Sequence, residues 1–125
     1  MNLLLDTHSL LWWLDDFAKL SPEADAAIRD GDNQVYVSAA STLEIAIKKA
    51  IGKLDAPNNL TELFTHHRFQ TIDITIPHTL EIESLPLIHT DPFDRLLAAQ
   101  AKHENFTLVT RDSDLLDYPI KTMLA

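Results

Sequence analysis

The sequence contains no cysteine, so it can form neither a disulfide framework nor a thiolate metal site. No apolar run is long enough to cross a membrane, and the amino terminus lacks the basic segment that opens a signal peptide. Positive charge is also scarce, with 10 lysines and arginines against 19 acids. From these absences we expect a cytoplasmic protein without membrane segments.

The net charge of −9 limits how the protein can bind a polyanion. A surface that holds nucleic acid by electrostatics alone is expected to be basic. If this chain handles nucleic acid, metal ions or a local strip of basic side chains must make the contact. An acidic chain also suits a basic partner protein.

The 125 residues suffice for one domain with one core, and the 46% hydrophobic content argues against disorder. Strand-like and helix-like segments alternate along the whole sequence. The expected strands are 3–5, 35–37, 70–76, 107–110 and 120–123, and the main expected helices are 9–14, 22–30, 41–50, 57–67, 77–84 and 92–104. This alternation predicts a single α/β domain over residues 1–125, with a central parallel sheet of four to five strands flanked by helices.

The first strand is expected to lie at the centre of the sheet. Leu3, Leu4 and Leu5 form an unbroken apolar run, which fits a strand buried on both faces, and Asp6 ends it. Ligands of open α/β sheets bind at the carboxyl ends of the strands, where a buried acid is costly unless something compensates it. Asp6 is therefore the first candidate site residue.

Three more acids are expected at the same edge. Glu44 lies early in the helix after the second strand, Asp94 opens the helix before the fourth strand, and Asp112 directly follows that strand. Helices that run antiparallel to a parallel sheet begin where its strands end, so these acids and Asp6 are expected to face one crevice. Asp114 is the alternative to Asp112.

Most of these acids also have a structural explanation. The segment Ser41–Glu44 has the pattern of a capping box. Asp91 is expected to cap the helix that carries Asp94, and Asp112 can cap the short turn that follows it. For Asp6 we expect no capping role.

Electrostatics favours the joint interpretation of the acids as one site. Two unit charges about 4 Å apart repel by about 4 kcal/mol at an effective dielectric near ~20. A crevice that holds four carboxylates must therefore take up protons or bind a cation. Because its donors are all oxygen, the expected cation is Mg²⁺ or Mn²⁺. Such a site suits the activation of water against a phosphodiester.

Four segments resemble, in order, the motifs of PIN domains, in the form found in VapC-type toxins of bacterial toxin–antitoxin pairs. They are Leu3–Thr7, Ser41–Glu44, Asp91–Ala101 and Leu108–Asp112, of which the third is the most specific. The resemblance implies an Mg²⁺- or Mn²⁺-dependent endoribonuclease. It also implies a set of metal-binding, catalytic acids, namely Asp6, Glu44, Asp94 and Asp112, with Asp114 as a substitute for the last.

The resemblance implies partners as well. A cognate antitoxin protein is expected to inhibit the nuclease with a tail in the acidic groove, and proteins of this family commonly form homodimers. RNA is the expected substrate, and nearby basic residues are candidates to bind its phosphates, namely Lys48, Lys49, Arg95 and Arg111. Each of them can equally be a solvated or ion-paired side chain.

Two alternatives remain open. A phosphatase that forms an aspartyl-phosphate on Asp6 is one, but its common family requires a second aspartate two positions later, where this chain has His8. A PIN-like module that only binds a partner is the other. Loss of cleavage and toxicity in an Asp6→Asn variant is expected for the nuclease alone.

Overall fold

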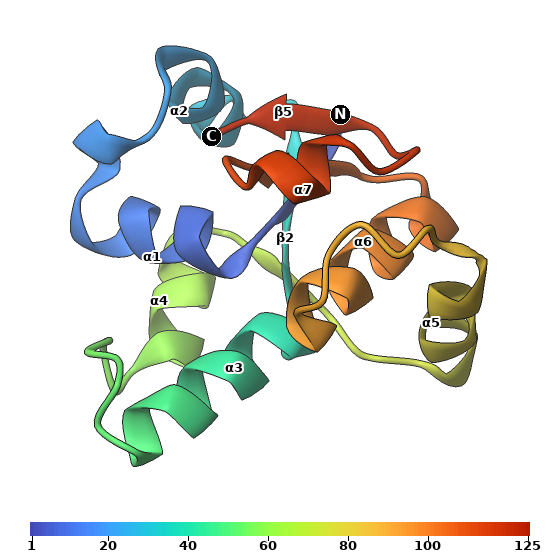
Figure 1. The fold of residues 1–125 in the computed structure, drawn as a ribbon. Coiled ribbons are helices and arrows are strands. Elements are labelled where there is room, and N and C mark those ends of the chain that lie inside the picture. Colours follow the sequence, from blue (N-terminus) through green and yellow to red (C-terminus); the bar gives the residue numbers. More distant parts are fainter.

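Five parallel strands form one sheet in the order β3-β2-β1-β4-β5 in the computed structural model, which describes residues 1–125 (Figure 1). The strands are β1 (Asn2–Leu5), β2 (Gln34–Ser38), β3 (Gln70–Ile72), β4 (Thr107–Thr110) and β5 (Thr122–Leu124). In the register of β1, Leu3 pairs with Val35 of β2 on one side and with Thr107 of β4 on the other. The prediction of a parallel sheet with the first strand at its centre is confirmed.

Helices connect the strands, as the alternating pattern predicts. The α-helices are α1 (Thr7–Asp15), α2 (Pro22–Arg29), α3 (Ala39–Ala50), α4 (Leu60–His66), α5 (Ile76–Glu81), α6 (Pro92–Glu104) and α7 (Ser113–Leu116). Two short 3-10 helices, η1 (Phe17–Lys19) and η2 (Ile82–Ser84), follow α1 and α5. None of the helices has both the length and the apolar character needed to span a bilayer.

The start of α3 differs from the prediction. Ser38, the last residue of β2, is the N-cap, because its hydroxyl oxygen accepts a hydrogen bond from the N–H of Ala40 at 2.9 Å. The helix therefore begins at Ala39, and the expected capping box at Ser41–Glu44 is wrong. Glu44 lies in the second turn of α3, where it is free of any capping role.

Other boundaries of helices and strands also differ from the predicted ones. The strand β3 ends at Ile72 instead of 76, because Thr75 leaves the sheet to cap α5 and accepts a hydrogen bond from the N–H of His78 at 3.3 Å. The helix α4 begins at Leu60, three residues later than expected, with Asn59 as its N-cap residue. Neither shift changes the order of the elements.

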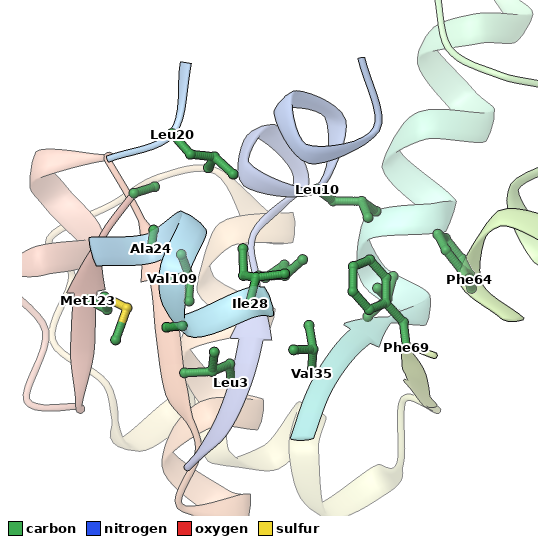
Figure 2. Packing of buried hydrophobic residues seen from close by; sticks show 14 of the residues in the cluster. Leu3, Leu10, Leu20, Ala24, Ile28, Val35, Phe64, Phe69, Val109 and Met123 are labelled. Carbon is green, nitrogen blue, oxygen red and sulfur yellow. The ribbon is translucent and has the colours of Figure 1, made fainter. Parts of the chain in front are cut away.

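Two apolar clusters cover the two faces of the sheet. On one face, Leu3 and Leu5 pack with residues of α1, α2, α3 and α4 (Figure 2). On the other face, Leu4 packs in a cluster that includes Leu97 of α6 and Leu115 of α7. All three leucines of β1 are fully buried, so the strand that ends in Asp6 is fixed from both sides.

Truncation of the central strand should destabilise the protein strongly. We expect Leu4→Ala to lower the free energy of unfolding by about 2–5 kcal/mol, because it leaves a cavity between β1 and α6. Urea denaturation monitored by circular dichroism measures this loss. The control is Leu87→Ala, at a side chain that is 87% exposed, which should change stability by less than about 0.5 kcal/mol. Equal effects of the two substitutions would contradict the described core.

Candidate active site

Asp6 lies at the end of β1 and is only 4% exposed. Its Oδ1 accepts a hydrogen bond from the N–H of Ser9 at 2.8 Å, so Asp6 is the N-cap of α1 and the expectation that it has no capping role is wrong. The hydroxyl of Thr110 donates to Oδ2 at 2.6 Å. Burial raises the pKa of Asp6, although both hydrogen bonds act in the opposite direction. A carboxylate has about four acceptor positions, so capping leaves others free for a cation.

Thr110, the last residue of β4, connects Asp6 to Asp112. Its hydroxyl donates to Asp6 and also accepts a hydrogen bond from the N–H of Asp112 at 3.0 Å. Asp112 caps α7, as expected, with Oδ1 2.8 Å from the amide nitrogen of Asp114. Burial alone would raise the pKa of Asp112, but hydrogen bonds from His89 and from amides of α7 hold it below its ordinary value.

Asp94 lies in the first turn of α6, next to the N-cap Asp91, whose Oδ1 accepts hydrogen bonds from two amides of that turn. Burial raises the pKa of Asp94 to about 7, assisted by the negative charges of Asp91, Asp6 and Glu44. Asp91, Asp6 and Glu44 are therefore near enough to Asp94 to act on its carboxyl group. Asp6 at the end of β1, Glu44 in the second turn of α3 and Asp94 in the first turn of α6 thus lie near one another, and we call this group, together with Asp112, the crevice.

Glu44 is 4% exposed and pairs with a lysine one turn further along α3. Its Oε2 lies 2.5 Å from Nζ of Lys48. This hydrogen bond raises the pKa of Lys48, and the charges of Asp91 and Asp94 raise it further, against the effect of burial. Lys48 therefore faces the acids from the rim of the crevice, with 41% of its side chain exposed.

The other three basic candidates are held by the protein itself. Lys49, Arg95 and Arg111 donate hydrogen bonds to main-chain carbonyl groups at 3.1, 3.3 and 2.9 Å. The guanidinium of Arg111 also lies 4.4 Å from the centroid of the Trp12 ring. Of the four basic candidates, Lys48 is the one that pairs with a crevice acid.

Two residues of the crevice were not predicted from the sequence, Thr110 and His89. Nε2 of His89 lies 3.0 Å from Oδ2 of Asp112 and 3.1 Å from Oδ2 of Asp94. His89 belongs to the loop that enters α6, two residues before the N-cap Asp91. A polar side chain this close to a capping acid was the only signal in the sequence, and it is a weak one.

The donor set of the crevice fits a hard divalent cation. Carboxylate oxygens from Asp6, Glu44 and Asp94 are buried or partly buried, and such charges require compensation. Beside them, ligand atoms of His89, Asp112 and Asp114 all lie within 4.8 Å of one another. Acidic clusters of this kind are able to bind a metal ion.

The raised pKa of Asp94 predicts how stability without metal depends on pH. The carboxyl group of Asp94 binds its proton more tightly in the folded protein than in the unfolded chain. Protonation of Asp94 therefore stabilises the fold fully below about pH 4, and this stabilisation is lost as the pH rises through about 7. We therefore expect Asp94→Asn to be more stable than the parent at pH 8 by ~1–2 kcal/mol, after allowance for solvent screening, and not at pH 4. Urea denaturation in EDTA at the two pH values measures this.

The matched control for this experiment is Asp16→Asn, which removes an exposed charge beyond α1 and should leave the pH dependence unchanged. If the free energy of unfolding of Asp94→Asn depends on pH as that of the parent does, the charge of Asp94 does not destabilise the fold.

Comparison with known proteins shows the family to which the chain belongs. A family model described as PIN domain matches residues 3–121. Ribonuclease VapC22 of Mycobacterium tuberculosis is 33% identical over 122 residues, which cover 91% of this chain and 89% of that protein.

Solved structures with the same fold include VapBC2 from Rickettsia felis bound to a DNA fragment from its promoter, with a TM-score of 0.70 at 17% identity over 98% of both chains. A toxin–antitoxin complex from Klebsiella pneumoniae gives a TM-score of 0.67 at 19% identity, over 97% of this chain and 95% of that one. At these identities the solved structures support the fold alone, whereas the family model and the sequence relative show the family of the chain. The chain belongs to the PIN-domain family.

Proposed function

We propose that the chain is a metal-dependent endoribonuclease and the toxin of a toxin–antitoxin pair, which hydrolyses RNA phosphodiester bonds with activated water. The observation that carries this proposal is the clustering of Asp6, Glu44 and Asp94, where burial first and then the neighbouring negative charges raise the pKa of Asp94 to about 7. The relative named as a ribonuclease supports RNA as the substrate. The toxin–antitoxin complexes among the solved structures support an antitoxin as the partner.

In this proposal, Asp6, Glu44 and Asp94 hold the principal Mg²⁺ or Mn²⁺ ion, and Asp112 holds a second ion or orients water. Asp112 is favoured over its substitute Asp114 because Thr110 links it to Asp6 by hydrogen bonds. Asp114 is exposed and has no such link.

A bound divalent cation would lower the pKa of a water molecule and offset the charge that develops on the phosphate. The protein residues prepare the crevice for this role. Near neutral pH and without metal, the carboxyl group of Asp94 is partly protonated. Because a carboxyl group binds a cation in its deprotonated form, cation binding is expected to release a proton. Lys48 presents its ammonium group beside the acids, where a phosphate of the RNA backbone would approach.

The acidic crevice also fits the proposed inhibitor. A basic side chain from an antitoxin tail would be attracted by the same carboxylates that hold the cation, and would exclude RNA from them. We propose that the protein forms this complex in the cytoplasm, and that the toxin itself forms a homodimer. Light scattering of the isolated toxin tests the second point.

Asp6→Asn should abolish cleavage without loss of the fold. Asparagine is an equally good N-cap, so the hydrogen bond from Ser9 can persist, while the negative charge is lost. We expect cleavage of a fluorescent RNA in Mg²⁺ to fall by at least about 100-fold, the scale seen when a group that stabilises transition-state charge is removed. The exposed Asp16→Asn change is the control and should leave the rate unaltered.

If Asp6→Asn cleaves RNA and arrests growth like the parent, the assignment of Asp6 is wrong. If EDTA leaves parental cleavage intact, the metal-dependent mechanism is wrong. A stable fold in Asp6→Asn, checked by circular dichroism, separates loss of chemistry from loss of structure.

Lys48→Gln should weaken RNA binding in a salt-dependent way. One lost phosphate contact lowers the slope of log K against log salt by about 0.7 for a single strand. Fluorescence anisotropy with a chain silenced by Asp6→Asn measures this slope. Lys49→Gln is the matched control, because Lys49 is occupied by the carbonyl of Pro57 and should not alter the slope. Equal slopes for Lys48→Gln and its parent would exclude Lys48 from the RNA contact.

A further inference from the structure

We propose that His89 is a positioning residue that holds Asp94 and Asp112 in the arrangement that receives the cation, without ligating the cation itself. This inference rests on the proposed function, because it assumes that the two carboxylates bind metal. It assigns a role to a side chain that was not among the site residues predicted from the sequence.

Hydrogen bonds hold both the ring and the main chain of His89. Its Nδ1 accepts a hydrogen bond from the N–H of Asp91 at 3.1 Å, and its own main-chain N–H donates to the hydroxyl of Tyr118 at 3.0 Å. Tyr118 is buried, and only 14% of the His89 side chain is exposed. The ring therefore has one defined orientation, with Nε2 directed at the acids.

This orientation also fixes the tautomer. A neutral imidazole has one N–H, and Nδ1 must be unprotonated to accept the hydrogen bond from Asp91. Nε2 therefore bears the proton, and this N–H donates a hydrogen bond to Oδ2 of Asp112. A metal bound at Nε2 would require the proton on Nδ1, where it would point at the N–H of Asp91. The distances alone would place His89 with Asp112 and Asp114 in a possible metal site, but these hydrogen bonds make His89 a donor and not a ligand.

The donor role has a clear consequence for the two carboxylates. Asp94 lies in the first turn of α6 and Asp112 caps α7, and each has an oxygen within 3.1 Å of the same nitrogen of His89. Two like charges this close to a common atom repel each other. The polarised N–H of His89 lies within 3.1 Å of an oxygen from each of them and offsets that repulsion. Hydrogen-bond partners of metal-binding side chains typically contribute 10- to 100-fold to metal affinity.

The first test is Mn²⁺ affinity, measured by electron paramagnetic resonance. We expect His89→Ala to weaken Mn²⁺ binding by about 10- to 100-fold. His89→Gln, whose amide nitrogen can replace Nε2 as a donor, should restore affinity to within about threefold of the parent. The control His66→Ala removes an exposed histidine of α4 and should bind Mn²⁺ like the parent.

The second test needs no substitution. Nitrogen chemical shifts of ¹⁵N-histidine-labelled protein report which ring nitrogen of His89 is protonated, before and after saturation with Mg²⁺. We expect Nε2 to keep its proton in both states. Loss of that proton at saturation would show that His89 ligates the cation, which would overturn the positioning role even if His89→Ala fails to fold.

The outcomes separate this inference from the proposed function. If the parent itself binds no Mn²⁺, the proposed metal site is wrong and the inference falls with it. If the parent binds Mn²⁺ and Asp94→Asn does not, while a folded His89→Ala binds like the parent, the metal site stands and the positioning role of His89 is refuted.

Discussion

Mutual repulsion among buried carboxylates is the constraint on which the rest of this structure depends. Asp6, Glu44 and Asp94 are brought together by strand direction and helix starts, and burial with neighbouring charges raises the pKa of Asp94 to about 7. Such an arrangement is costly in isolation. The fold tolerates it because the buried leucines of β1 leave Asp6 no freedom to move away, and because each acid has a partner. Thr110 and the amide of Ser9 donate hydrogen bonds to Asp6, Lys48 pairs with Glu44, and His89 lies beside Asp94.

The hydrogen-bond network around these acids gives the crevice its order. Thr110 joins Asp6 to Asp112 by hydrogen bonds, and His89, which is hydrogen-bonded to Asp112, lies 3.1 Å from Asp94, so groups at the starts of α1, α6 and α7 form one connected set. Capping and metal binding are compatible here, since an acid that caps a helix still presents free lone pairs. The same carboxylates therefore stabilise the local structure and remain available for a cation.

Much of this arrangement was predictable from the sequence, because the central place of the first strand and the parallel direction of the strands follow from simple patterns. The apolar run before Asp6 predicts a central strand, and parallel strands bring their carboxyl ends to one edge. Details that depend on competition between similar groups were not predictable. Ser38 and Ser41 are both acceptable caps for α3, and only the length of β2 decides between them. His89 escaped prediction because the path of an irregular loop leaves no periodic signal.

The central claim is that the converged acids bind a divalent cation in exchange for a proton. Calorimetric titration of the metal-free protein with Mg²⁺ at pH 7, in two buffers of different ionisation enthalpy, tests it directly. We expect saturable binding with net proton release that disappears in Asp94→Asn. Absence of Mg²⁺ binding, or binding that is identical in the parent and in Asp94→Asn, would contradict it.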